Sequence, residues 1–165
     1  MKTHRLFTKE ECNDIISTLL NEYELVHYDK PYGNSSTKYN KVTIDKSYWF
    51  YDRIKDWVNK ELNIDTNSTL LFVKYNVGDR FLVHVDRVKE SEYHCDFLWN
   101  VNIILNEGYE GGEFIINNTH YKEPAGTIYY YSSDMLHSVS EITKGERYVF
   151  LYHVRERDIK EYENI

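Results

Sequence analysis

Residues 75–86 read YNVGDRFLVHVD, and this stretch indicates both a local structure and a chemistry. Its Val77-Gly78-Asp79 turn separates two short runs of aromatic and β-branched residues, as expected for neighbouring β-strands. Polar and apolar residues alternate in the second run, which predicts a strand over 81–86. His84 and Asp86 would share one face of that strand, where an imidazole and a carboxylate can bind the same metal ion. The opposite, apolar face would carry Phe81, Val83 and Val85.

The His-x-Asp triplet is a short motif that occurs three times in the chain, at 27–29, 84–86 and 94–96. Its context favours 84–86, because the first copy lies in a polar stretch and the third in a charged one. The best candidate for a third ligand is His137, which follows the β-rich stretch 126–131. Two histidines and one carboxylate on one side of a metal ion leave coordination positions open. Such an arrangement suits Fe(II) that binds a co-substrate and O2.

Amphipathic segments precede the strand-rich part of the chain. Thr8 and Glu11 have the spacing of a capping box, and apolar residues recur at helical intervals behind them, which predicts a helix over 8–22. A second amphipathic helix is predicted over 47–62. The intervening segment 23–46 is polar and rich in turn residues, so it is predicted to be a loop with at most one short strand. Strands are predicted at 69–77, 81–86, 97–105, 113–117, 126–131 and 147–154.

The order of these elements predicts an α+β protein that is mainly β, with N-terminal helices packed on a β-sandwich or barrel. A length of 165 residues fits a single domain. Within it we expect helical support and a loop over 1–68, a β core over 69–154 and a charged tail over 155–165.

The composition excludes several classes of function. A net charge of -7 disfavours nucleic acid as a partner, because affinity for phosphate backbones comes largely from Lys and Arg. The chain shows neither a signal-peptide pattern nor an apolar run long enough for a transmembrane helix, so we expect an intracellular protein without a membrane partner. Cys12 and Cys95 are expected to be reduced thiols. A single alanine among many Lys, Asn, Ile and Tyr residues indicates an AT-rich source genome.

Four sequence blocks carry a resemblance to a known family. They are the 75–86 stretch, Asn102 to Asn106 leading to Glu110-Gly111-Gly112-Glu113-Phe114, Pro124-Ala-Gly126-Thr, and His137 to Arg147. In the first block a tyrosine lies nine residues and a glycine six residues before His84, and in the last Arg147 follows His137 by ten residues. With these blocks in this order, the chain resembles the 2-oxoglutarate and Fe(II)-dependent dioxygenases, closest to their prolyl 4-hydroxylase-like branch. The resemblance runs from about Leu71 to His153.

The resemblance implies a double-stranded β-helix, or jelly roll, with a metal site in its open end. It implies that His84, Asp86 and His137 bind Fe(II), which itself is the catalytic centre without a separate acid or base. Arg147 would bind the distal carboxylate of 2-oxoglutarate with its guanidinium fork, and Tyr75 would add a hydrogen bond. Weaker expectations place Asn102 against the co-substrate and His153 and Tyr131 beside the iron or the substrate. Many relatives carry a bulky aromatic residue where this chain has His153.

The cofactors implied are Fe(II), 2-oxoglutarate and O2, with ascorbate in a supporting role. The expected reaction hydroxylates an aliphatic C–H bond, with a prolyl residue of a protein or peptide as the first choice of substrate, and releases succinate and CO2. A small-molecule hydroxylase, a nucleic-acid demethylase and a non-catalytic binding or sensor domain on the same fold stay open as alternatives. Segments 23–46 and 87–96 are expected to shape substrate access. The oligomeric state stays open.

Overall fold

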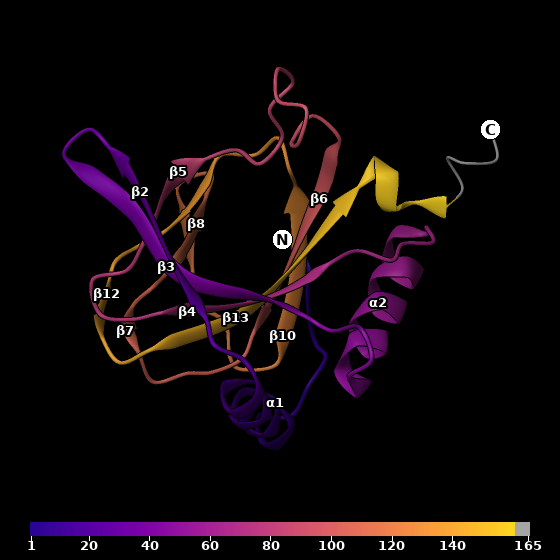
Figure 1. Ribbon diagram of the computed structural model, residues 1–165, viewed down its shortest axis with the longest axis horizontal. Helices are drawn as coiled ribbons and strands as arrows, with labels where there is room; N and C mark the ends of the chain where they lie inside the picture. The colour runs from indigo at the N-terminus through magenta and orange to yellow at the C-terminus, as the bar shows by residue number, and fades with distance from the viewer. Residues whose placement is uncertain (161–165) are drawn as a thin grey trace.

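The computed structural model describes residues 1–160, and antiparallel β-sheet dominates it (Figure 1). Two helices cover one side of the sheet, α1 (Lys9–Glu22) and α2 (Trp49–Leu62). The strands are β1 (Thr3–Arg5), β2 (Val26–Tyr32), β3 (Ser35–Ile44), β4 (Leu70–Tyr75), β5 (Phe81–His84), β6 (Phe97–Ile104), β7 (Glu110–Gly111), β8 (Phe114–Ile116), β9 (Thr119–Tyr121), β10 (Thr127–Ser132), β11 (His137–Val139), β12 (Ile142–Lys144) and β13 (Arg147–Arg155). A short 3₁₀ helix, Glu156–Asp158, follows β13.

The strands form two main sheets that enclose an apolar interior. The larger sheet has seven strands in the order β1-β10-β6-β13-β4-β3-β2, and the smaller has four in the order β5-β11-β8-β9. A two-stranded pair, β12-β7, completes the barrel. One cluster of buried residues joins the sheets, with Val73 and Val149 from the larger one and Phe114 and Ile116 from the smaller one. This is the predicted double-stranded β-helix.

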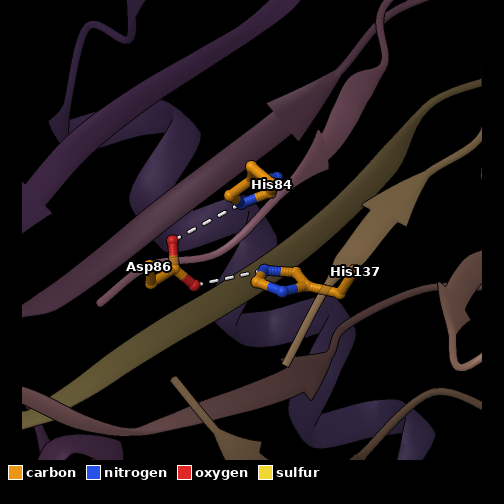
Figure 2. A group of neighbouring side chains, drawn as sticks. All are labelled: His84, Asp86 and His137. Atoms are coloured by element: carbon orange, nitrogen blue, oxygen red, sulfur yellow. Dashed lines mark ion pairs between the residues drawn. The ribbon is translucent and has the colours of Figure 1, made fainter. Parts of the chain in front are cut away.

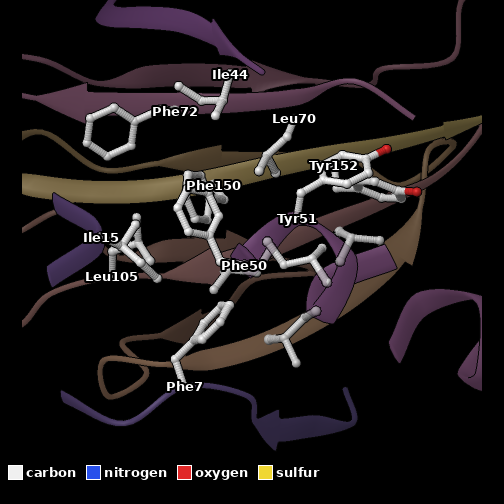
Figure 3. Packing of buried hydrophobic residues seen from close by; sticks show 14 of the residues in the cluster. Phe7, Ile15, Ile44, Phe50, Tyr51, Leu70, Phe72, Leu105, Phe150 and Tyr152 are labelled. Carbon is white, nitrogen blue, oxygen red and sulfur yellow. The ribbon is translucent and has the colours of Figure 1, made fainter. Parts of the chain in front are cut away.

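The helices bury the outer face of the large sheet, as predicted (Figure 3). Thr8 caps α1 with the predicted capping box, because its side chain accepts from the Glu11 amide while the Glu11 carboxylate accepts from the Thr8 amide. A second cluster of buried residues lies between the helices and the large sheet, and in it Phe50 of α2 stacks on Phe150 of β13, with ring centroids 5.3 Å apart. Among the described helices, none is long and apolar enough to cross a membrane.

Strand β13 divides its side chains between the two clusters. Tyr148, Phe150 and Tyr152 point toward the helices. The alternating residues Arg147, Val149, Leu151 and His153 point into the barrel and line one cavity. Because successive side chains of a strand point to opposite faces, helix packing on one face fixes which residues of β13 reach the interior.

Segment 23–46 is not the predicted loop: it forms the β2–β3 hairpin, which joins the large sheet through β3 and β4. Gly33, with a φ of +62°, lies in its turn. The prediction was wrong because β2 is an edge strand whose residues are mostly exposed, so it shows no apolar alternation. Pro31 also reads as a strand breaker, although an edge strand tolerates it. In Figure 1 the hairpin extends beyond the barrel next to β5.

Strand β5 ends at His84, so the predicted strand over 81–86 is two residues too long. Opposite β11, the pairs His137–His84 and Val139–Phe81 leave one extra residue on β5, which is a β-bulge. The bulge turns Phe81 toward His84, so that the two rings stack with centroids 3.8 Å apart. Val83, which was expected on an apolar face, is 66% exposed instead.

The two ends of the chain contribute more to the fold than the sequence indicated. β1 pairs with β10, so the segment 1–68 supplies three strands to the large sheet as well as the helices. Ile159 is buried and pairs with Thr66, so residues 155–160 pack on the domain and are not a solvated tail. The remainder of that predicted tail, 161–165, lies outside the described residues. The strands β1, β7, β9, β11 and β12 were not predicted, and the single short strand allowed in 23–46 accounts for only one of β2 and β3.

Truncating the ring at the centre of the helix-facing core should destabilise the fold. Phe150→Ala is expected to lower the free energy of unfolding by about 3–5 kcal/mol, because it removes a fully buried aromatic side chain and leaves a cavity. Tyr32→Ala is the matched control, since Tyr32 is 76% exposed, and should change it by about 0.5 kcal/mol or less. Urea denaturation followed by circular dichroism measures both. Equal midpoints for the two variants would contradict this account of the core.

Candidate active site

Three side chains that could bind a metal converge at one end of the barrel (Figure 2). His84 ends β5, Asp86 follows two residues later, and His137 begins β11 opposite His84. Nε2 of His84 lies 3.4 Å from Oδ1 of Asp86, and Nε2 of His137 lies 3.1 Å from Oδ2. One ligand atom from each residue falls within 4.8 Å of the other two. The strand pairing therefore brings together residues that are far apart in the sequence.

Both imidazoles present the nitrogen that a metal needs. Nδ1 of His84 lies 2.7 Å from the Leu82 carbonyl oxygen, and Nδ1 of His137 lies 2.9 Å from that of Met135. A carbonyl only accepts, so Nδ1 must donate in each ring, and Nε2, which faces Asp86, is the nitrogen left to bind a metal in place of its proton. Such backbone partners fix the tautomer and orientation of ligating histidines. The donor set thus fits a metal ion.

The Asp86 carboxylate is held in its anionic form. Burial raises its pKa, but the hydrogen bonds with His137 and His84 lower it more, so the pKa lies well below its usual range. The Asn100 amide also donates to Asp86 Oδ2, and the Ser133 hydroxyl in turn donates to Asn100 Oδ1 at 3.0 Å. Asn100 therefore orients the carboxylate. This role was not predicted, because the partners of Asn100 are contributed by other segments of the chain.

Aromatic rings hold the two imidazoles from the sides. Phe81 stacks on His84 at 3.8 Å, and Tyr131 meets His137 edge to face at 4.8 Å between ring centroids. Tyr131, 7% exposed, thus lies beside the metal-binding group as expected. Its burial raises the pKa of the phenol well above its usual range, so the hydroxyl stays neutral.

The triad opens into a cavity that contains a buried cation at its base. Arg147 lines this cavity with Tyr75, its partner across β4 and β13. Arg147 is only 2% exposed, and its Nε has no hydrogen-bond partner. Among residues 1–160, no ion pair involves Arg147. Because an unpaired buried charge is costly, this site calls for an anionic ligand.

Tyrosines surround the guanidinium in place of a carboxylate. Its central carbon lies 5.1 Å from the centroid of the Tyr75 ring, within range of a cation–π interaction. Burial lowers the pKa of Arg147, but the hydroxyls of Tyr75, Tyr109 and Tyr129 raise it more. Burial also raises the pKa of Tyr75 to about 12, against an opposing effect of Arg147. The site therefore contains a permanent cation and neutral phenols, which can bind a carboxylate through charge and hydrogen bonds.

Asn102 and His153 reach the same cavity from neighbouring strands, β6 and β13. The Asn102 amide donates to the Tyr129 hydroxyl at 3.2 Å, so part of its hydrogen-bonding capacity is already used. The imidazole of His153 packs edge to face on Phe97, with centroids 5.2 Å apart. Nδ1 of His153 is buried without a partner. Every residue that the sequence nominated for the site thus lines one cavity.

Segment 87–96 lies beside this cavity and is fixed by one carboxylate. Asp96 accepts from Arg155 Nη2 at 3.0 Å and from Arg157 Nε at 2.7 Å. The Arg155 guanidinium also lies 4.5 Å from the ring centroid of Tyr93. The segment is therefore fastened to the end of β13, next to His153. By contrast, His27, in one of the two His-x-Asp triplets that the sequence context disfavoured, lies exposed on the hairpin.

Comparisons with known proteins agree with this geometry. Residues 70–155 match the family model of the 2OG-Fe(II) oxygenase superfamily. A PKHD-type hydroxylase of Prochlorococcus marinus is 28% identical over 163 residues, which cover 89% of this chain and 74% of that protein. Another, from a Picosynechococcus species, is 39% identical over 90 residues, or 51% of this chain. That alignment spans only 40% of the relative's length.

Solved structures share the fold at low sequence identity. The viral collagen prolyl hydroxylase of Paramecium Bursaria Chlorella virus-1, in its 2OG complex, has a TM-score of 0.75 at 17% identity, covering 93% of this chain and 94% of that one. A prolyl-4-hydroxylase from Pseudomonas putida has a TM-score of 0.70 at 16% identity, covering 94% and 92%. Both are similar in architecture over nearly the whole chain.

A side chain at Gly112 should displace the buried cation. A Cβ there would lie 2.4 Å from Cδ1 of Ile142 and 3.1 Å from Cδ of Arg147. We expect Gly112→Ala to weaken 2-oxoglutarate binding about 10-fold or more, because small displacements of a carboxylate clamp are costly. Gly33→Ala is the matched control, since Gly33 has a similar φ of +62° but nothing within 4 Å of its Cβ position. Calorimetric titration of the Mn(II)-loaded variants measures both. Equal affinities would contradict this role of Gly112.

The contacts of Asp96 should make stability depend on pH on the acid side. Burial raises the pKa of Asp96, but hydrogen bonds from Arg157 and Arg155 lower it more, so its folded-state pKa lies below the unfolded value. The stabilisation is therefore present above the unfolded pKa of about 4 and is lost as pH falls through the folded pKa. At pH 7, Asp96→Asn should have a free energy of unfolding about 2 kcal/mol lower than that of wild type.

Thermal denaturation between pH 7 and pH 2.5 tests this dependence. The difference in melting temperature between wild type and Asp96→Asn should disappear as the pH falls below about 4. Asp56→Asn, at an exposed position of α2, is the control and should follow wild type throughout. A gap of constant size down to the lowest pH would show that the carboxylate charge is not what stabilises this segment.

Proposed function

The chain belongs to the 2OG-Fe(II) oxygenase superfamily, and on that premise we propose that it hydroxylates an aliphatic C–H bond of a prolyl residue in a protein or peptide. The observation that carries the proposal is the presence, in one cavity, of a metal-binding triad and an unpaired buried guanidinium. The triad provides for the metal and the guanidinium for an organic anion. Few other ligand pairs need both.

In this proposal His84, Asp86 and His137 bind Fe(II). Their three ligand atoms converge on one side, which leaves the positions toward the cavity open. Asn100 holds the Asp86 carboxylate, while Leu82 and Met135 carbonyls hold the two imidazoles. These contacts fix the ligands before the metal binds, which lowers the cost of assembling the site.

Arg147 binds the distal carboxylate of 2-oxoglutarate, and Tyr75 donates a hydrogen bond to it. The guanidinium fork matches a carboxylate in shape and charge. Pairing would also give a partner to the buried Nε of Arg147, which has none in the free protein. In this proposal Asn102 of β6, which lines the same cavity, contacts the same ligand. Bound together, Fe(II), 2-oxoglutarate and O2 supply the oxidising chemistry, with succinate and CO2 as products. The apolar wall formed by Phe81, Phe114 and Leu151 excludes water from it.

A prolyl substrate is supported by what the relatives are called. The curated relatives carry the name PKHD-type hydroxylase, and two structures of similar fold are described as prolyl hydroxylases. The net charge of -7 weighs against nucleic acid, which would need a basic groove. A free small molecule and a non-catalytic role are the remaining outcomes that an assay must separate.

The test measures succinate release from 2-oxoglutarate with Fe(II), O2 and ascorbate, and a mass increase of about 16 Da on proline-containing peptides. Wild type should release succinate, and His84→Ala should abolish release because the metal loses one of three ligands. Arg147→Ala should raise the KM for 2-oxoglutarate about 100-fold, through loss of a charged pairing. His120→Ala, at an exposed position of β9, is the control.

Each result decides a part of the proposal. No succinate release by wild type, together with no thermal stabilisation by metal and 2-oxoglutarate, would refute an oxygenase. Succinate release with oxidation only of free amino acids or methylated oligonucleotides would leave the reaction class standing and overturn the prolyl substrate.

A further inference from the structure

His153 lies on the side of the metal triad away from the buried cation. The inward residues of β13 run from Arg147 to His153, six residues apart, which is about 20 Å along a strand. His153 pairs with Asn100 of β6, and Asn100 donates to the metal-binding carboxylate Asp86. His153 is thus level with the metal ligands. A co-substrate that reaches from Arg147 to the metal approaches from one side, and His153 borders the opposite side.

The imidazole of His153 lacks a hydrogen bond that its burial requires. Its Nδ1 is enclosed and has no partner. Leaving such a group unsatisfied costs about 1–3 kcal/mol, and native structures rarely do so without a reason. The ring is also fixed in place, because Phe97 packs against it and Arg155, ion-paired with Asp96, lies over Phe97 at 4.8 Å. A ligand group that entered beside the ring would satisfy this nitrogen.

The charges lining the cavity restrict what that ligand group can be. Among the lining residues Arg147 is the one Lys or Arg, and it lies six residues from His153 on the same strand. A carboxylate beside His153 would therefore find no cationic side chain there to pair with, and the Asp86 side chain would repel it. A neutral carbonyl oxygen needs only one donor, which an imidazole N–H provides. The lining thus favours an amide carbonyl over an acid.

We propose that His153 determines substrate specificity by donating a hydrogen bond from Nδ1 to a peptide carbonyl next to the carbon that is hydroxylated. The inference rests on the proposed function and names the substrate class as a residue within a peptide, against a free amino acid. A prolyl residue suits this donor, because its nitrogen carries no hydrogen and the amides before and after it both offer carbonyl oxygens as acceptors. An apolar aromatic residue at 153 would provide a wall without this hydrogen bond.

Nitrogen-detected NMR of the histidine side chains tests the contact directly. The protein, loaded with Zn(II) and 2-oxoglutarate so that no turnover occurs, is titrated with N-acetyl-L-prolinamide, which has both amide carbonyls and no charge. The Nδ1 resonance of His153 should shift, and that of exposed His120 should not. L-proline, a zwitterion, should leave His153 unchanged. No shift with the amide, or a larger shift with L-proline, would overturn the proposal.

Two substitutions separate hydrogen bonding from shape. His153→Asn keeps an N–H donor on a shorter side chain and should retain affinity for the amide within about 3-fold, whereas His153→Phe should weaken it about 10-fold or more. Both should bind 2-oxoglutarate as wild type does, and His120→Phe is the matched control for the same change at an exposed site. Equal affinity of His153→Phe and wild type for the amide would refute the hydrogen bond.

Failure of this inference can be told from failure of the proposed function. If wild type releases succinate from 2-oxoglutarate but the amide leaves His153 unshifted, only the role of His153 is refuted. If wild type neither binds 2-oxoglutarate nor releases succinate, the proposed function fails and this inference fails with it.

Discussion

The alternation of side chains along β13 is the constraint on which the rest of the structure depends. Tyr148, Phe150 and Tyr152 pack under the helices, so Arg147 and His153 must face the barrel interior. A slip of one residue would drive a guanidinium into the helix-facing core and move an aromatic ring into the site. Such a slip would lose the burial of apolar side chains under the helices and would bury a charge in the apolar core, and both effects are unfavourable. The helices, which contribute no residue to the cavity lining, thereby determine where the candidate site residues lie.

The metal-binding group depends in turn on a local irregularity. His84 and His137 face each other because β5 and β11 are paired, and the bulge in β5 brings Phe81 onto the imidazole of His84. A regular strand would have directed Phe81 to the opposite face from His84. Bulges commonly re-aim side chains next to active sites, and here the bulge also ends the strand before Asp86. The carboxylate is then free to turn toward both histidines.

Much of the site could be predicted from sequence because its residues lie at fixed spacings within short segments. His84, Asp86, His137 and Arg147 are of this kind, and the sheet places all four around one cavity. What escaped prediction depends on partners distant in the sequence. The hairpin at 23–46 consists of an exposed edge strand, β2, and a polar strand, β3, which joins the large sheet by pairing with β4. Asn100 gains its role from Asp86 and Ser133, and the bulge at Phe81 follows from pairing with β11. No local pattern encodes these contacts.

The tyrosines around Arg147 have a physical reason. A buried guanidinium needs compensation, and a carboxylate would give the most, but it would also occupy the fork that an anionic ligand must use. Aromatic rings and phenol hydroxyls compensate part of the charge and leave the fork open. Tyr75 and Tyr129 do this here, and burial raises the pKa of each to about 12, so neither becomes an anion that competes with the ligand. In the free protein the charge of Arg147 is therefore only partly compensated. A carboxylate that binds completes the compensation, and this contributes to its binding free energy.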